Sequence, residues 1–213
     1  MDKESFNFET AQQFIENEFK NIVITSLSEF IKIPNLSPSY DPTWQTNGNQ
    51  EKAANFLINY ANNQGIKGLK AELIETKGRT PMIVIEISAQ NSSKNYLIYG
   101  HFDKQPHLEG WYEGLGPTTP VIKGDLLYGR GSSDDGYALF SVLASIKAVQ
   151  SQNKSHGRII ILIEGAEESS CEDLNFYLNS LNDRIGVPDL LICLDSGCLD
   201  YETLWITSSL RGY

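Results

Sequence analysis

The amino-terminal part of the chain shows two helical patterns. Over residues 10–32 apolar side chains recur on one face, and Pro34 ends the pattern. That face consists of Ile15, Phe19, Ile22, Val23, Leu27, Phe30 and Ile31. A second helix is predicted over about 50–64, with Gly65 at the position where helices commonly stop.

Beyond Gly65 the pattern changes to that of strands. Leu69–Ile74 and Met82–Ile87 are predicted to form strands on either side of a turn at Gly78. Three shorter runs are apolar or aromatic throughout, and these are Tyr96–Tyr99, Ile159–Ile163 and Leu190–Leu194. Runs of this kind are typical of strands inside a sheet that helices cover on both faces.

Helical patterns separate these runs, over 137–149 and about 174–181. The alternation of strands with helices predicts an α/β sandwich. The stretch Lys104–Gly131, rich in glycine and proline, is predicted to be a long loop within that domain. Loops of this length inside a domain are more often functional than accidental.

The composition narrows the classes of partner and compartment. The 213 residues are 40% hydrophobic and 21% charged, as in an ordinary globular domain, and the net charge of −10 argues against nucleic acid and anionic membranes. No apolar run reaches the ~18 residues of a membrane span, and the amino terminus lacks the pattern of a signal peptide. Cys171, Cys193 and Cys198 have no C-x-x-C spacing, which indicates neither a disulfide framework nor a cysteine zinc site. We therefore expect a reducing cytoplasm.

Side chains suited to metal binding and proton transfer follow each of the three apolar runs. They occur in Gly100-His101-Phe102-Asp103, in Glu164-Gly165-Ala166-Glu167-Glu168 and in Asp195-Ser196-Gly197. A further acidic pair, Asp134-Asp135, closes a glycine-rich loop and opens the next predicted helix. Because ligands of open α/β sheets bind at the carboxyl ends of strands, we expect these side chains to meet in one crevice.

A crevice with this many carboxylates needs positive charge. The carboxylates would repel one another strongly without bound cations, and one histidine with carboxylates and no thiolate suits Zn²⁺, Mn²⁺ or Co²⁺. Taken alone, Asp134-Asp135 could cap a helix, Glu167-Glu168 could be a solvated loop, and His101 could be a core histidine. Their shared position at strand ends favours the metal site over these separate interpretations.

Four segments also resemble, in order and spacing, the motifs of a known family. Gly100–Asp103 resembles G-H-x-D, Leu127–Asp135 resembles LYGRGxxDxKG, Glu164–Ser169 resembles EGxEE, and Leu194-Asp195 resembles a strand-terminal aspartate. The family is that of the co-catalytic zinc metallopeptidases, which include carnosinase, dipeptidase V, carboxypeptidase G, aminoacylase and succinyl-diaminopimelate desuccinylase. The resemblance implies a three-layer α/β/α sandwich with a largely parallel mixed sheet.

The resemblance also implies a pair of metal ions. His101 and Asp195 would hold one metal, Asp134 would bridge both, and Glu168 would ligate the other. The cofactor would be Zn²⁺, two per complete site, with Mn²⁺ or Co²⁺ as alternatives. Two such ions lower the pKa of a shared water and polarise a scissile carbonyl.

Two further residues and one peptide bond receive roles from the same resemblance. Glu167 would be the general base, and Asp103 would orient the imidazole of His101. The peptide bond between Asp134 and Asp135 would be cis.

The implied function is a metal-dependent hydrolase that cleaves the amide bond of dipeptides or N-acyl amino acids through a metal-bridging water. The lysine that usually follows the aspartate pair is missing, which resembles a dipeptidase-like subgroup. Full-length relatives are often homodimers, whereas this chain is expected to be monomeric.

The family resemblance also sets expectations for the domain organisation. Residues 1–209 would be the amino-terminal part of the catalytic domain, and residues 210–213 would begin a lid or dimerisation domain whose remainder is absent. Neither His107 nor His156 occupies the place of the family's last metal-binding histidine. The alternative is therefore a truncated or split, catalytically inactive metal-binding fragment that needs a complementary carboxyl-terminal segment.

Overall fold

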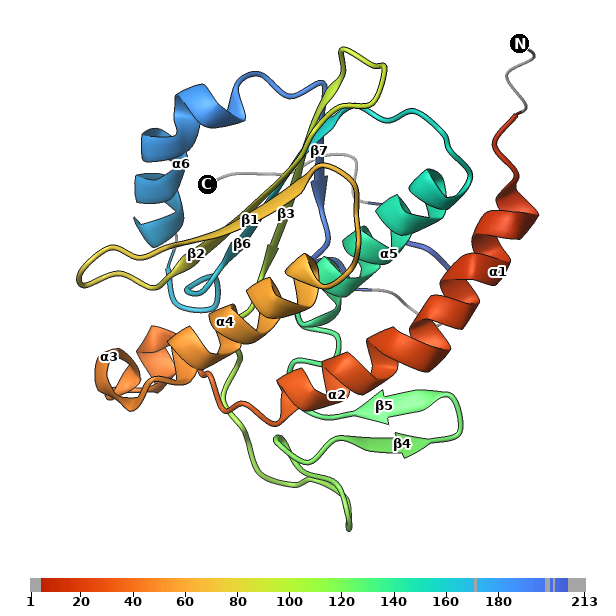
Figure 1. Cartoon of the computed structure of the whole chain (residues 1–213). Coiled ribbons are helices and arrows are strands. Elements are labelled where there is room, and N and C mark those ends of the chain that lie inside the picture. Colours follow the sequence, from red (N-terminus) through yellow and green to blue (C-terminus); the bar gives the residue numbers. More distant parts are fainter. Residues whose placement is uncertain (1–4, 171, 198–199, 201, 207–213) are drawn as a thin grey trace.

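The computed structural model describes residues 5–170, 172–197, 200 and 202–206, and within them a mixed sheet is covered by helices on both faces (Figure 1). The strands are β1 (Leu69–Ile74), β2 (Met82–Ile87), β3 (Asn95–His101), β4 (Val121–Lys123), β5 (Leu126–Tyr128), β6 (Arg158–Glu164) and β7 (Leu190–Cys193). The helices are α1 (Phe8–Glu18), η1 (Phe19–Val23), α2 (Ile24–Ile31), η2 (Pro38–Tyr40), α3 (Trp44–Asn47), α4 (Asn49–Asn62), α5 (Tyr137–Ser151) and α6 (Glu172–Ile185).

The main sheet has the strand order β1-β2-β6-β3-β7. Strand β2 is antiparallel to both of its neighbours, while β3 is parallel to β6 and to β7. Four strands therefore run in one direction and β2 in the other, which confirms the largely parallel mixed sheet. Strands β4 and β5 form a separate hairpin.

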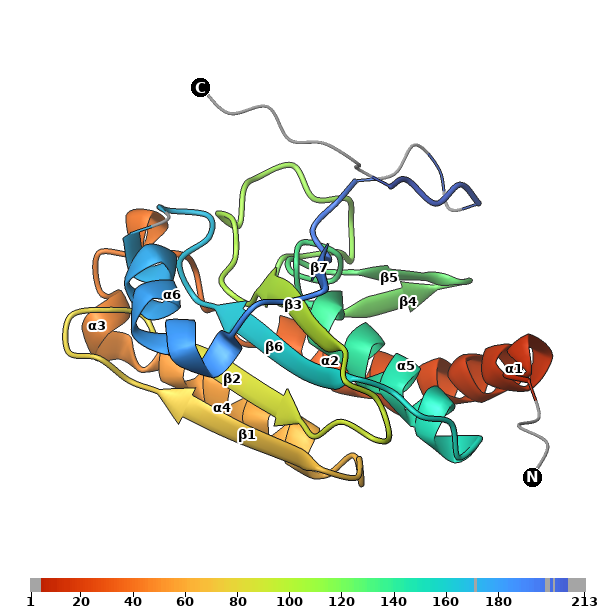
Figure 2. The same cartoon turned by 90° about the horizontal axis from the view of Figure 1, so that it is seen from above.

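Alternating side chains of the strands build one core on each face of the sheet. Ile83, Ile85 and Ile87 of β2 pack into the larger core with residues of α2, α4 and α5. Met82 and Val84 point to the opposite face, where they pack against buried residues of α6. Figure 2 shows α6 on one side of the sheet and the other long helices across it. The three layers expected from the sequence are thus present.

The first helical segment differs from a regular helix in its middle. The expected helix over 10–32 is found as α1, η1 and α2, and η1 is a π-helical turn in which the N–H of Ile24 donates to the carbonyl of Phe19. A π turn inserts an extra residue, and hydrophobic spacing alone does not reveal such an insertion. Val23 of this turn is fully buried in the larger core.

Strand β7 differs from its expected environment. Its apolar run predicted a strand covered on both faces, but β7 lies at the edge of the described sheet, with Leu190 and Leu191 exposed by 51% and 53%. That part of the prediction is wrong for the described residues. An apolar run indicates a strand, but it does not reveal which other residues cover the strand's side chains.

The long loop over 104–131 also contains more order than expected, because the β4–β5 hairpin lies inside it. Cys193 is free and exposed. Cys171, Cys198 and the expected boundary after residue 209 lie outside the described residues. Across the described part of the chain, no helix combines the length and apolarity that crossing a membrane requires.

A buried lysine joins the end of α2 to the segment that follows β3. Lys104 is 1% exposed, and its Nζ donates to the carbonyls of Phe30 and Ile33 at 3.0 and 2.7 Å. The ammonium also lies 4.2 Å from the centroid of the Phe30 ring. Burial lowers the pKa of Lys104 to about 7.

This lysine makes stability depend on pH in a defined direction. From about pH 7 to about pH 10, the free energy of unfolding of the wild-type chain should rise relative to that of Lys104→Met. The reason is that the unfolded lysine, with its ordinary pKa of 10.5, binds more protons in this range than the folded one. Denaturant titrations at several pH values measure the difference between the two proteins. A difference that stays constant or falls as the pH rises contradicts the assignment.

Candidate metal centre

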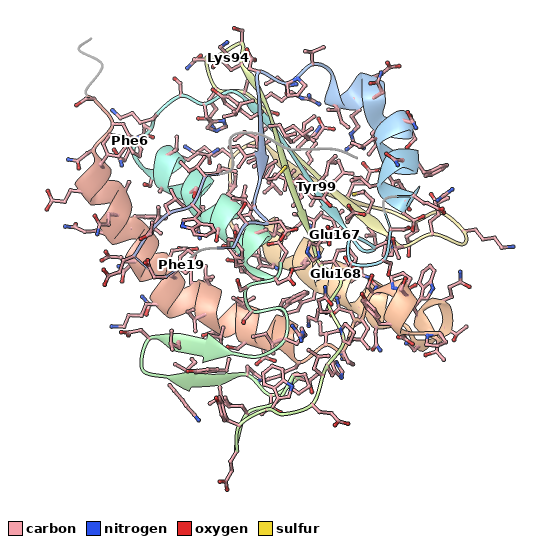
Figure 3. The ribbon with its side chains drawn as sticks, turned by 180° about the vertical axis from the view of Figure 1, so that it is seen from behind. Phe6, Phe19, Lys94, Tyr99, Glu167 and Glu168 are labelled. Atoms are coloured by element: carbon pink, nitrogen blue, oxygen red, sulfur yellow. The ribbon has the colours of Figure 1, made fainter. Side chains whose placement is uncertain are left out.

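The parallel arrangement of three strands brings their carboxyl ends to one edge of the sheet. His101 at the end of β3 is in register with Glu164 at the end of β6, and Tyr99 is in register with Cys193 of β7. The chain then carries Asp195 two residues beyond the end of β7. Figure 3 shows Tyr99, Glu167 and Glu168 gathered at this end of the sheet.

The glycine-rich loop before α5 adds the aspartate pair. Gly131 has a φ of +83°, and a Cβ at this position would lie 2.6 Å from Cε of Lys104. A Cβ on Gly136 would lie 1.9 Å from the carbonyl oxygen of Gly131. Both positions therefore require glycine for the tight turn. The peptide bond between Asp134 and Asp135 is cis, as the family resemblance implies.

Three carboxylates surround Nε2 of His101. Oδ1 of Asp134 lies 3.2 Å away, and Oε2 of Glu167 and Oδ2 of Asp195 each lie 3.8 Å away. The imidazole is fully buried, whereas the three carboxylates are one third to one half exposed. One ring nitrogen thus emerges from the core into a ring of acidic groups that solvent and ligands can reach.

Glu168 completes the ring. Potential ligand atoms of His101, Asp134 and Glu168 lie within 4.8 Å of one another, as do those of His101, Glu167 and Asp195. Gln105 donates a hydrogen bond to Oε2 of Glu168. These carboxylates line a pocket of about 370 Å³, together with Gln105, Ser133, Tyr137, Ser196 and Gly197.

Asp103 connects the histidine to the loop that carries both glutamates. Its fully buried carboxylate accepts hydrogen bonds from the backbone N–H groups of Glu167 and Glu168, at 3.2 and 3.1 Å. Oδ1 of Asp103 also lies 3.3 Å from Nδ1 of His101. Asp103 therefore fixes the histidine ring and the glutamate backbone with one side chain.

Comparison with known proteins places this arrangement in a family. The model of peptidase family M20/M25/M40 matches residues 97–204, which include the whole carboxylate ring. The chain belongs to this family. Its members are metal-dependent hydrolases, and the motifs recognised in the sequence are the segments that form the ring.

Individual relatives support the same assignment. The chain is 28% identical to an uncharacterized metallohydrolase of Methanocaldococcus jannaschii, over 87% of this chain and 48% of that protein. It is 26% identical to a Cys-Gly metallodipeptidase of Schizosaccharomyces pombe, over 91% of this chain and 42% of that protein. The structure of the Saccharomyces cerevisiae di-peptidase Dug1p has a TM-score of 0.74 at 23% identity, covering 90% of this chain and 41% of that one. The chain thus spans less than half the length of these relatives.

The charges of the site act strongly on His101 in this M20-family chain. Burial opposes protonation of the ring, but hydrogen bonds with Asp103 and Asp134 outweigh it and raise the pKa of His101 to about 11. The hydrogen bond with His101 in turn lowers the pKa of Asp134. The carboxylates therefore stabilise the positively charged form of the imidazole, as they would stabilise a bound cation.

The pKa values of Glu167 and Glu168 are raised because both carboxylates are partly buried among other acidic groups. Burial raises the pKa of Glu167, and the neighbouring carboxylates add to the shift. For Glu168, burial together with Asp134 raises the pKa to about 7. The ring is thus short of positive charge, and its donors are one imidazole nitrogen and several carboxylate oxygens. This donor set fits divalent cations such as Zn²⁺ or Mn²⁺.

Two buried carboxylates below the ring were not among the predicted site residues. Oδ2 of Asp135 accepts the backbone N–H of His101 at 3.0 Å, and Glu164 accepts a hydrogen bond from the hydroxyl of Tyr99. Burial raises the pKa of Asp135 to about 8 and that of Glu164 to about 7. Their motif positions were visible in the sequence, but their roles depend on burial, which the sequence does not display.

Gln105 was also missed as a site residue. Its contact with Glu168 joins the start of the long loop to the loop after β6, 63 residues further along the chain. No local pattern signals a pairing at that separation.

We expect Asp103→Asn to weaken metal binding about 10- to 100-fold, because an amide cannot accept all the hydrogen bonds of the carboxylate without turning a donor toward an N–H group. Titration of the metal-free chain with Zn²⁺ measures the affinity. Asp189→Asn, which alters a carboxylate on the exposed Lys94 ion pair, is the matched control and should leave the affinity unchanged. Equal affinities for Asp103→Asn and wild type contradict the role assigned to Asp103.

Proposed function

We propose that this chain carries the metal-binding part of a hydrolase that cleaves the amide bond of dipeptides or N-acyl amino acids. The observation that carries the proposal is the ring of carboxylates around Nε2 of His101, which opens into a pocket of about 370 Å³. Family membership supports hydrolysis, and the names of two relatives, a Cys-Gly metallodipeptidase and a di-peptidase, support a peptide substrate.

We assign four residues to metal binding. His101 and Asp195 would hold one ion, Asp134 would be shared, and Glu168 would bind a second ion. The distances of 3.2 and 3.8 Å from Nε2 of His101 to Asp134 and Asp195 support the first position. When bound, a pair of Zn²⁺ ions polarises a carbonyl and lowers the pKa of a water.

Glu167 has the position of a proton carrier in this scheme. Its backbone is fixed by Asp103, and its side chain lines the same pocket as Asp134 and Asp195. The carboxylate would accept a proton from the attacking water and return it to the leaving amine. Burial raises the pKa of Glu167, and this assists the second transfer because it favours the protonated form that gives up the proton.

The division of roles between the adjacent glutamates leads to a direct test in the complete enzyme. Glu167→Gln should lower turnover roughly 10²–10⁴-fold and leave metal content unchanged, because it removes a proton carrier. Glu168→Gln should lower turnover and should also lower the metal content, because it removes a metal ligand. Turnover with a dipeptide and metal analysis of both variants measure this, with the exposed Glu9→Gln on α1 as the control. Equal metal loss from Glu167→Gln and Glu168→Gln contradicts the assignment.

A second candidate is a metal-binding fragment that needs a complementary carboxyl-terminal segment. The half-exposed apolar residues of β7 favour it, because an exposed edge strand is a template for another strand. The share of relatives that this chain spans, 48% or less in those compared, also favours it. The cytoplasmic location, the monomeric state and the boundary after residue 209 stay predictions.

The fragment hypothesis predicts the behaviour of the 213-residue chain by itself. We expect it to bind at most one tightly held Zn²⁺ and to show no dipeptide hydrolysis above background. In the proposed assignment His101, Asp134 and Asp195 would supply three ligands for one ion, whereas the second position would have Glu168 and a share of Asp134. Metal analysis after gel filtration and a dipeptidase assay measure both quantities. Two stoichiometric ions with turnover like that of ordinary enzymes contradict the hypothesis.

A further inference from the structure

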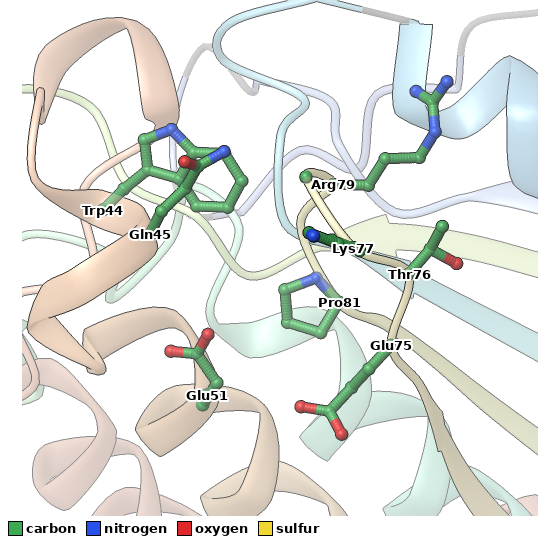
Figure 4. Close-up of a pocket in the computed structure, with 9 residues that line it drawn as sticks. Trp44, Gln45, Glu51, Glu75, Thr76, Lys77, Arg79 and Pro81 are labelled. Atoms are coloured by element: carbon green, nitrogen blue, oxygen red, sulfur yellow. The ribbon is translucent and has the colours of Figure 1, made fainter.

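A second cleft lies between the α3–α4 corner and the turn that joins β1 to β2, and it shares no lining residue with the carboxylate ring. Its volume is about 350 Å³. Figure 4 shows Trp44 and Glu51 on the helical side, facing Lys77 and Pro81 on the other. The cleft is thus walled by an aromatic ring and a carboxylate on one side and by a β-turn on the other.

The β-turn wall is held rigidly from behind. Asp173 of α6 accepts hydrogen bonds from Nη1 of Arg79 at 2.6 Å and from the backbone N–H of Thr80 at 2.9 Å. The Arg79 guanidinium also lies 4.3 Å from the centroid of the Phe176 ring, and the hydroxyl of Tyr177 donates to the carbonyl of Thr80 at 2.8 Å. The turn is therefore fixed to α6 without any ligand, and Arg79 is already engaged.

The helical wall offers an aromatic ring, that of Trp44, and an acid, Glu51, one of whose carboxylate oxygens is unpaired. Oε2 of Glu51 is shielded from solvent, and no described residue donates a hydrogen bond to it. In the described part of the chain Glu51 also has no ion-pair partner. A carboxylate left without a donor in such a place gains more from a cation than a solvated one does.

The chemistry of the two walls selects the ligand. An anion would meet the carboxylates of Glu51 and Glu75, and the guanidinium of Arg79 is already held by Asp173. An ammonium group, by contrast, would be attracted by the carboxylate of Glu51, and an apolar body attached to it would have the ring of Trp44 and Pro81 in the same lining to pack on. Lys77, the cation of the opposite wall, is exposed, so solvent screens its charge.

We propose that the cleft formed by Trp44, Glu51 and Pro81 is a binding site for small organic cations in which a primary ammonium group is joined to an apolar body. The site is separate from the metal centre, and its occupancy does not depend on a bound metal.

Isothermal titration calorimetry of the full 213-residue chain tests the proposal, with phenethylammonium as the probe and 2-phenylethanol as its uncharged counterpart. The wild-type chain should bind phenethylammonium at least about tenfold more tightly than 2-phenylethanol. Glu51→Gln should abolish this preference, since the amide keeps the size of the side chain and loses its charge. Trp44→Leu, on a different helix, should weaken the binding of phenethylammonium by about tenfold.

Two control variants separate the cleft from other acidic groups. Glu9→Gln changes a carboxylate that, like Glu51, lies in the first turn of a helix, and it should bind phenethylammonium as the wild type does. Glu168→Gln reduces the negative charge of the metal centre and should also bind normally. Thermal unfolding checks that each variant is folded.

Three outcomes overturn the proposal. The first is that the wild-type chain binds neither probe. The second is that Glu51→Gln keeps the preference for phenethylammonium, and the third is that Glu168→Gln loses this preference. The last result would place the cation in the carboxylate ring instead. None of these measurements uses hydrolysis, so a failure of the proposed function would leave the result for this cleft unaffected.

Discussion

The arrangement of the candidate site depends on one buried carboxylate, that of Asp103. It accepts the backbone N–H groups of Glu167 and Glu168 and lies 3.3 Å from Nδ1 of His101. His101 ends β3, and the two glutamates lie in the loop that follows β6. These strands are far apart in sequence but parallel and adjacent in the sheet. Because one carboxylate contacts all three residues, it holds the imidazole of His101 in a fixed position relative to the backbone of the two glutamates.

The same region concentrates negative charge that the described residues balance only in part. Asp135 and Glu164 lie buried beneath the ring, and in each of them one oxygen has no hydrogen-bond donor among the described residues. Ionising these two buried groups costs free energy of folding, which is why their pKa values are raised, and a bound cation would offset that cost. Membership of peptidase family M20/M25/M40 agrees with that use of the carboxylates.

Much of this architecture could be predicted from local patterns. The strands at 69–74 and 82–87 follow the hydrophobic pattern residue by residue. The site residues other than Asp134 were predicted from their common place after strand ends, and Asp134 from its glycine-rich loop. The π turn at 19–23 and the β4–β5 hairpin could not be predicted, because both are small deviations that hydrophobic spacing does not record. The contact of Gln105 with Glu168 and the exposure of β7 depend on long-range packing, which local patterns do not contain.

The central claim is that the carboxylate ring around His101 is a metal site, and the most direct measurement is a crystal structure of the chain soaked with Zn²⁺, with anomalous diffraction collected at the zinc edge. The account predicts an anomalous peak about 2.0–2.2 Å from Nε2 of His101, with carboxylate oxygens of Asp134 and Asp195 at similar distances. Glu167 would lie in the pocket without binding the ion. Ordered density for all four side chains with no anomalous peak among them would contradict the account.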